Sequence, residues 1–188
     1  MLAEVRVWEP QRRVILFGSA ALLVSLEGMA EEEFGFETTL DADLLLVPDD
    51  DAVRRKLDAE LGSGSAYDAS TGHHGDFVDF RISRDFFPMG WQTRLVVMKG
   101  FAGVFALSIA DNAAAKLLAT ASARLNRRMG GDAADRGLKD IRSIASLLRA
   151  GLLTEAELNG RLDSVGASRA LMVEADGVLR ETIAVARE

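Results

Sequence analysis

The sequence predicts an α+β protein in which a mixed β-sheet flanked by helices is followed by a C-terminal helical part. Residues 1–108 alternate short apolar runs with helical patterns, whereas residues 109–188 have helical periodicity. An apolar fraction of 48% with only three prolines among 188 residues is typical of a chain that buries a core. We therefore expect an α/β core over residues 1–108 and a C-terminal helical region, packed on that core, over residues 109–188.

Short runs of apolar and β-branched residues predict the strands of the first region. These runs lie at 14–17, 41–47, 77–82, 95–98 and 104–107. The last two are expected to form a hairpin around Lys99 and Gly100. Helices are expected at 20–26 and, after the capping aspartates that follow Pro48, at 52–61.

The second region predicts a series of helices separated by glycines. Asp111 is expected to cap a helix that runs to about Arg128. Further helices are expected at 138–149, after the capping box that begins at Thr154, and at 168–186.

Composition excludes several classes of site. The chain has no cysteine, which excludes disulfides, thiolate nucleophiles and zinc–thiolate sites and suits a cytoplasmic protein. The apolar stretch 14–26 is too short to span a bilayer, so we expect no membrane partner. A net charge of −7 argues against nucleic-acid binding through overall charge.

Two carboxylates one residue apart, Asp41 and Asp43, precede the apolar run Leu44–Val47. Residues two apart on a strand lie on the same face, and like charges that close repel each other. A divalent metal ion would relieve this repulsion. The alternative is that both acids cap the end of a strand in solvent.

Gly18 and Ser19 fall between a predicted strand and a predicted helix. A glycine there lets the backbone approach a phosphate, and the N–H groups at the helix start favour an anion. The alternative is ordinary turn chemistry. Asp79, flanked by Val78 and Phe80, adds a third acid, and carboxylates on neighbouring strands would form an oxygen-rich site for Mg²⁺ or Mn²⁺. The alternative for Asp79 is an outward-facing acid on a half-exposed strand.

Together these motifs resemble the nucleotidyltransferase superfamily. The matching segments are Leu16-Phe17-Gly18-Ser19, Asp41-Ala42-Asp43-Leu44 and Val78-Asp79-Phe80. The helical stretch after Asp111 and the sequence Leu138-Lys139-Asp140 resemble the small bacterial branch that includes abortive-infection and toxin–antitoxin nucleotidyltransferases.

The resemblance implies a nucleotidyltransferase-like fold and transfer of a nucleoside monophosphate from an NTP to a hydroxyl of tRNA or protein. Gly18 and Ser19 would hold the triphosphate, Asp41 and Asp43 would bind metal, and Asp79 would complete the metal site or act as the base. Lys116 would contact phosphate, or is a surface residue or a partner of Asp111. Asp140 has either a role in the site or a place on the helix surface. The rival is a non-catalytic antitoxin or regulatory subunit of a two-protein module, which the acidic insertion Glu31–Glu33 favours.

Other features favour structural explanations. His73 and His74 are expected on an exposed loop flanked by glycines, and the alternative is that they bind a metal. Trp91 is expected in the core or as an anchor of its loop, and the alternative is that it stacks on a base. The basic residues between 124 and 149 alternate with acids, so a salt-bridged helix surface is expected rather than an RNA contact.

Overall fold

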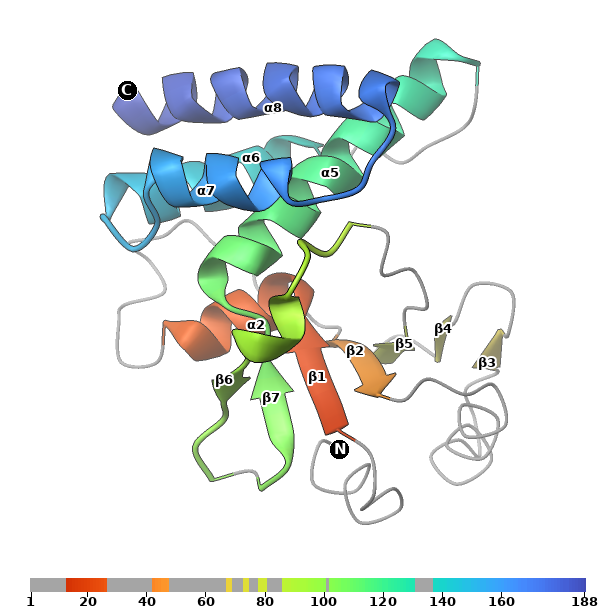
Figure 1. Cartoon of the computed structure of the whole chain (residues 1–188), viewed down its shortest axis with the longest axis vertical. Coiled ribbons are helices and arrows are strands. Elements are labelled where there is room, and N and C mark those ends of the chain that lie inside the picture. Colours follow the sequence, from red (N-terminus) through yellow and green to blue (C-terminus); the bar gives the residue numbers. More distant parts are fainter. Residues whose placement is uncertain are drawn as a thin grey trace. The chain divides into compact units, whose positions relative to one another are not determined.

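The computed structural model describes residues 13–26, 42–47, 67–68, 73–74, 78–80, 86–100, 102–130 and 137–188. For residue 24 and for the strands between residues 42 and 80, the description covers the backbone. The chain is an α+β protein, as predicted (Figure 1). It divides into two compact units. The sheet unit ends at residue 108, and the helical unit contains residues 86–91 and the described residues from 109 onward.

The sheet unit contains a seven-stranded mixed sheet in the order β3-β4-β5-β2-β1-β7-β6. Its strands are β1 (Arg13–Phe17), β2 (Ala42–Val47), β3 (Tyr67–Asp68), β4 (His73–His74), β5 (Val78–Phe80), β6 (Val96–Val97) and β7 (Val104–Ala106). Strand β1 is antiparallel to β2 and parallel to β7, and β2 is parallel to β5. The two-residue strands β3 and β4 were not predicted, and His73 and His74 lie on a strand where a loop was expected.

The core of the sheet unit lies around β1 and the helix that follows it, α2 (Gly18–Ser25). Val14, Ile15 and Leu16 expose 2% of their surface or less. Helix α2 packs on β1, β2 and β7 and contributes the fully buried Leu22. Consecutive residues of β1 are buried, so both faces of this strand are covered, and it carries a continuous apolar run where a half-exposed strand would alternate apolar and polar residues.

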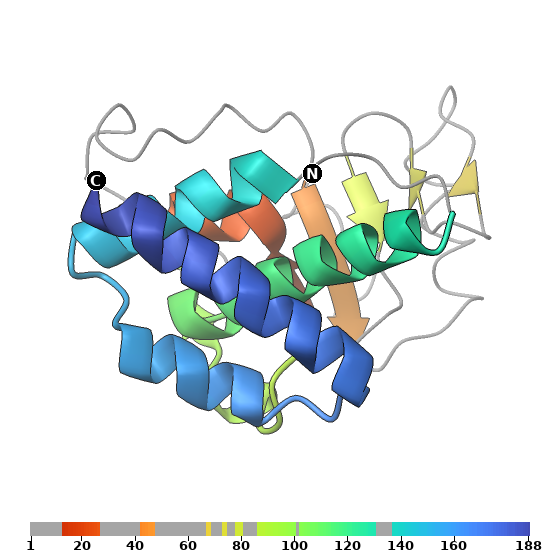
Figure 2. The ribbon, with the colours of Figure 1, turned by 90° about the horizontal axis from the view of Figure 1, so that it is seen from above.

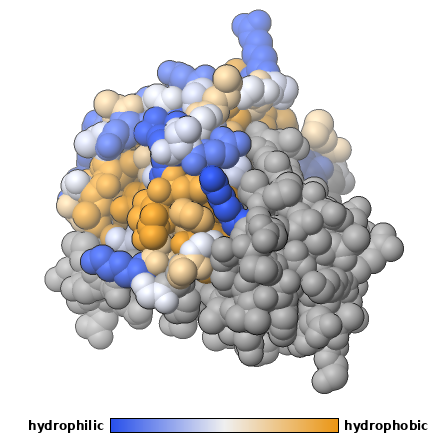
Figure 3. Space-filling model, turned by 60° about the horizontal axis from the view of Figure 1, so that its bottom comes forward, coloured by the Kyte–Doolittle hydropathy of each residue, from blue (hydrophilic) through white to orange (hydrophobic). Residues whose placement is uncertain are grey.

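Strands β6 and β7 form the predicted antiparallel hairpin. Gly100 lies in its turn with a φ of 81°, a backbone conformation that side-chain-bearing residues rarely adopt. Strand β6 is at the edge of the sheet, and its Val96 and Val97 are 45% and 66% exposed. An edge strand of two residues offers a partner strand few backbone groups, which limits unwanted pairing. On the face that Figure 3 shows, apolar residues gather on part of the surface of the described residues.

The helical unit is built around α5 (Ile109–Arg128), which packs against the three helices that follow it. These are α6 (Gly137–Arg149), α7 (Glu155–Asp163) and α8 (Arg169–Arg187). Helix α8 lies across α5 and also packs on α6 (Figure 2). Leucines and isoleucines at helical spacing, such as Leu117, Ile144 and Leu158, are fully buried between these helices.

The ends of the helices agree with the sequence except at Asp111. Thr154 caps α7 with the predicted capping box, in which its hydroxyl accepts from the N–H of Glu157 at 3.2 Å. Ser168 caps α8. The prediction that Asp111 caps α5 is wrong, because the helix begins at Ile109 and Asp111 lies inside its first turn.

Trp91 anchors the segment 86–91 within the helical unit. It is 4% exposed and meets the ring of Phe87 edge-on, with the ring centroids 5.3 Å apart. The backbone N–H of Met89 donates to the carbonyl of Ser164 at 3.2 Å. The structural explanation expected for Trp91 is confirmed, and this segment belongs to the helical unit although the sequence places it in the first region.

Candidate active site

The junction of β1 and α2 places Gly18 and Ser19 at the start of a helix. Gly18 is buried and has a φ of 70°, in the left-handed region that favours glycine. Ser19 is half-buried in the first turn. The positive end of the helix dipole and the first N–H groups of a helix stabilise an anion at such a place. The local structure therefore suits the phosphate contact that the sequence predicts for Gly18 and Ser19.

The sheet register brings the predicted acids beside this junction. Phe17, which immediately precedes Gly18, pairs with Asp43 of β2. Asp43 in turn pairs with Asp79 of β5. Residues paired directly across neighbouring strands lie on the same face of a sheet, and neighbouring strands are roughly 4.7–4.9 Å apart. Asp43 and Asp79 are thus neighbours on one face, near the end of β1 that leads into α2.

Two directly opposed carboxylates destabilise a sheet unless a cation or a proton compensates them. Carboxylate oxygens are the ligands that Mg²⁺ and Mn²⁺ prefer. The donor set at this position therefore fits a divalent metal ion. Asp41, the other predicted metal ligand, and the acidic insertion Glu31–Glu33 lie outside the described residues.

Side chains that the structure describes form no group of three or more histidines, aspartates or glutamates able to hold a metal. A metal ion at Asp43 and Asp79 is therefore a prediction from the backbone register of β2 and β5.

Lys116, the predicted phosphate contact, lies on α5 in the helical unit. Its Nζ is 2.6 Å from Oδ1 of Asp140 on α6, and both side chains are only 12–13% exposed. The hydroxyl of Thr120 donates to the other oxygen of Asp140 at 3.4 Å. The structure thus pairs Lys116 with Asp140, whereas the sequence offered Asp111 as its partner. Contact of Lys116 with phosphate stays a prediction.

Asp111 is fully buried and has a different partner. Its Oδ1 lies 3.3 Å from Nε of Arg161 on α7. Among the described residues no atom, Asp111 included, accepts a hydrogen bond from that buried Nε, so the contact with Asp111 is an ion pair that acts on it through charge alone. Sequence reasoning missed this pair because its members lie on different helices.

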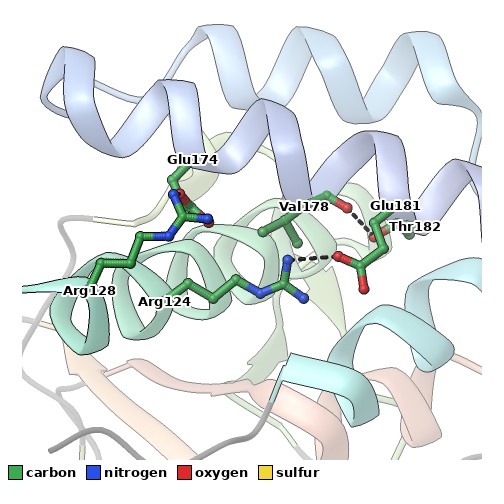
Figure 4. A network of polar contacts seen from close by, with 6 residues as sticks. All are labelled: Arg124, Arg128, Glu174, Val178, Glu181 and Thr182. Carbon is green, nitrogen blue, oxygen red and sulfur yellow. Dashed lines mark hydrogen bonds and ion pairs between the residues drawn. The ribbon is translucent and has the colours of Figure 1, made fainter.

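Two of the basic residues on α5 pair with acids on α8 (Figure 4). Arg124 lies 2.6 Å from Glu181, and Arg128 lies 2.5 Å from Glu174. For these two arginines the expected salt-bridged helix surface is confirmed.

Asp68 and His73 continue the row of paired residues. Sequence reasoning missed Asp68, whereas it weighed His73 and His74 as metal ligands and favoured an exposed loop. His73 pairs with Asp79 on one side and with Asp68 on the other. A signal was present, because Tyr67-Asp68 and His73-His74 flank Ala69-Ser70-Thr71-Gly72, a composition typical of a short turn between strands.

Comparison of this chain with protein-family models, with curated proteins and with solved structures finds no match. Among the described helices, none is both long enough and apolar enough to cross a membrane.

Proposed function

We propose that this chain is a metal-dependent nucleotidyltransferase with a nucleotidyltransferase-like fold. It would move a nucleoside monophosphate from an NTP to a hydroxyl of RNA or protein. The observation that carries the proposal is the pairing of Phe17 with Asp43 and of Asp43 with Asp79. This register sets two acids beside a glycine–serine junction at the start of a helix, and metal-dependent phosphoryl transfer commonly combines a phosphate-binding element with metal-binding acids.

Each group has a part in the proposed reaction. The backbone at Gly18 and Ser19 holds the triphosphate at the start of α2. Asp41 and Asp43 would hold Mg²⁺ or Mn²⁺, which would neutralise charge on the phosphates. The oxygen of the acceptor hydroxyl attacks the α-phosphorus, and the bond from that phosphorus to the leaving pyrophosphate breaks. Asp79 receives the hydroxyl proton or shares in holding the metal.

Label transfer tests this proposal. Each of the four α-labelled NTPs is incubated with Mg²⁺ or Mn²⁺, a total tRNA and protein extract, and the purified chain. Asp43→Ala and the double variant Asp41→Ala/Asp43→Ala are run beside it. Asp176→Ala is the matched control, because Asp176 is an exposed acid on α8. We expect label with the wild type and with Asp176→Ala only, and only when metal is present.

Other outcomes contradict the proposal. Label transfer that persists in the double variant would exclude Asp41 and Asp43 as the metal ligands. Absence of label with folded wild type would favour the non-catalytic antitoxin or regulatory subunit, and co-purification of a partner protein would then be the next measurement.

A further inference from the structure

Helix α6 presents a basic face to solvent. The exposed residues of this helix are Leu138, Arg142 and Arg149. Arg142 and Arg149 are seven residues apart in the sequence, which is close to two full turns of an α-helix. Both arginines therefore lie on one side of α6, about 10 Å apart along its axis.

The acid of α6 does not neutralise this face. Asp140 is the acidic residue of the helix, and its side chain is only 13% exposed because its Oδ1 lies 2.6 Å from Nζ of Lys116. Arg149 donates at 2.8 Å to the backbone carbonyl of Val185, an uncharged acceptor. The side chain of Arg142 forms no hydrogen bond or ion pair with a residue that the structure describes. Both arginines thus keep their charge available at the surface.

The arginines of α5 behave differently. Arg124 pairs with Glu181 of α8. Arg128 pairs with Glu174 of the same helix. The expected salt-bridged surface is therefore present between α5 and α8, whereas the exposed arginines of α6 have no carboxylate partner among the described residues.

The acidity of the chain is concentrated away from α6 in the sequence. Residues 1–108 hold eighteen of the 29 acids but only ten of the 22 lysines and arginines. Residues 109–188 hold eleven acids and twelve basic residues. The net charge of −7 thus belongs to the first region, and salt screens exposed charges beyond roughly 10 Å. A local basic face can bind a polyanion in spite of the overall charge.

We propose that the face of α6 formed by Arg142 and Arg149 binds the phosphate backbone of RNA, which makes RNA rather than protein the acceptor of the transferred nucleotide. This inference deepens the proposed function and rests on it for the choice of RNA among polyanions. The guanidinium group presents a planar fork of donors that matches phosphate oxygens. A chain of phosphates can meet both arginines wherever it crosses the helix, whereas an acidic protein needs two carboxylates at matching positions.

The composition of α6 also indicates how the RNA is read. The helix contains no aromatic residue on which a base could stack. Contacts to phosphate position a nucleic acid without reading its bases. Binding at this face is therefore independent of base sequence and dependent on salt.

The test is the affinity of the full chain for a fluorescein-labelled oligouridylate, measured by fluorescence anisotropy without NTP at roughly 0.05–0.2 M salt. The variants are Arg142→Ala, Arg149→Ala and the double variant. Arg180→Ala is the matched control, because it removes an exposed arginine of α8 and changes the net charge equally. Each α6 substitution should reduce the slope of log K against log salt by about 0.7 and weaken binding about fivefold at about 0.1 M salt. Arg180→Ala should change neither.

Arg149→Lys separates the charge from the shape of the side chain, since it keeps the cation and should keep the wild-type slope. Far-UV circular dichroism checks that each variant is folded. RNA binding that the double variant leaves unchanged would overturn the inference, as would an equal loss in Arg180→Ala or an absence of binding at low salt. Equally tight, arginine-dependent binding of labelled polyglutamate would also overturn it, because the face would then suit an acidic protein.

RNA binding and label transfer are separate measurements, so the two proposals can fail separately. If the double variant loses RNA binding but the wild type transfers no label, the RNA-binding face stands and the proposed function fails. If the wild type transfers label but the double variant binds RNA as the wild type does, the inference fails and the proposed function stands.

Discussion

Lys116 and Asp140 form an ion pair between α5 and α6, with Nζ 2.6 Å from Oδ1 and both side chains largely buried. The two residues also occur in the segments for which the sequence predicts a resemblance to small nucleotidyltransferases. Their pairing therefore has two explanations, one structural and one functional, and these explanations predict different behaviour of substituted proteins.

Asp140→Asn and Lys116→Met should each lower the free energy of unfolding by about 2 kcal/mol, because each leaves a partly buried polar group without its charged partner. Denaturant unfolding of both variants and of the double variant measures the coupling between them. A coupling energy near zero would contradict the structural explanation. If Lys116 also contacts phosphate, Lys116→Met should weaken NTP binding more than Asp140→Asn does.

Arg161→Ala should destabilise the protein by removing the charged neighbour of the fully buried Asp111. We expect a loss of about 2 kcal/mol, less than the roughly 3–5 kcal/mol for fully buried pairs, because Arg161 is about one-third exposed. Denaturant unfolding measures it, and Arg180→Ala, which removes an exposed arginine of α8, is the control. Equal effects of the two substitutions would show that the pair adds nothing to stability.

The capping box of α7 should make stability depend on pH. The hydroxyl and the backbone N–H of Thr154 donate to Glu157 at 2.7 and 2.9 Å and, with the charge of Arg161, hold the pKa of Glu157 below its ordinary value of 4.5. A carboxylate with a lowered pKa in the folded state stabilises it above pH 4.5, and this stabilisation is lost as the pH falls through the lowered pKa.

Glu157→Gln should therefore be less stable than the wild type at neutral pH, and the difference should shrink in acid. Thermal unfolding measured from neutral pH down to below pH 4.5 tests this effect. Asp176→Asn on α8 is the control for loss of an exposed charge. Thr154→Ala should cost about 1 kcal/mol at neutral pH. A difference between Glu157→Gln and wild type that does not change with pH would contradict the assignment.

Gly18→Ala and Gly177→Ala should have opposite effects on stability. Gly18 has a φ of 70°, where an alanine costs about 1–2 kcal/mol. Gly177 lies inside α8, and a methyl group there meets no atom within 4 Å. Alanine at Gly177 should stabilise by about 0.4–1 kcal/mol, because it restricts the unfolded chain. Unfolding measurements on both variants check this, and stabilisation by Gly18→Ala would exclude the left-handed conformation at the junction.

Local patterns predicted the elements whose signals lie within a few residues. The capping box at Thr154 and Glu157, the hairpin around Gly100 and the helices of the second region are all present. The strands β3 and β4 were missed because two residues are too few to show a period of two.

Relationships between distant residues were not predictable in this way. Asp111 has the residue type of a helix cap, yet it lies inside α5, where its carboxylate forms an ion pair with Arg161 of another helix. Similarly, Asp43 and Asp79 could be named from the sequence, but their direct pairing is a property of the sheet register. The pairing of His73 with Asp79 and with Asp68 likewise became visible only when the strand pairing was known.

The parallel pairing of β1 with β7 also constrains how the protein folds during synthesis. Val14 pairs with Val104, so β1 acquires its second neighbour only after the whole segment between these two residues has left the ribosome. Pairing between strands so distant in sequence forms slowly, whereas successive helices such as α5 and α6 meet through nearer contacts. Until β7 arrives, one edge of an apolar strand is unsatisfied, and a nascent chain in that state is a natural substrate for chaperones.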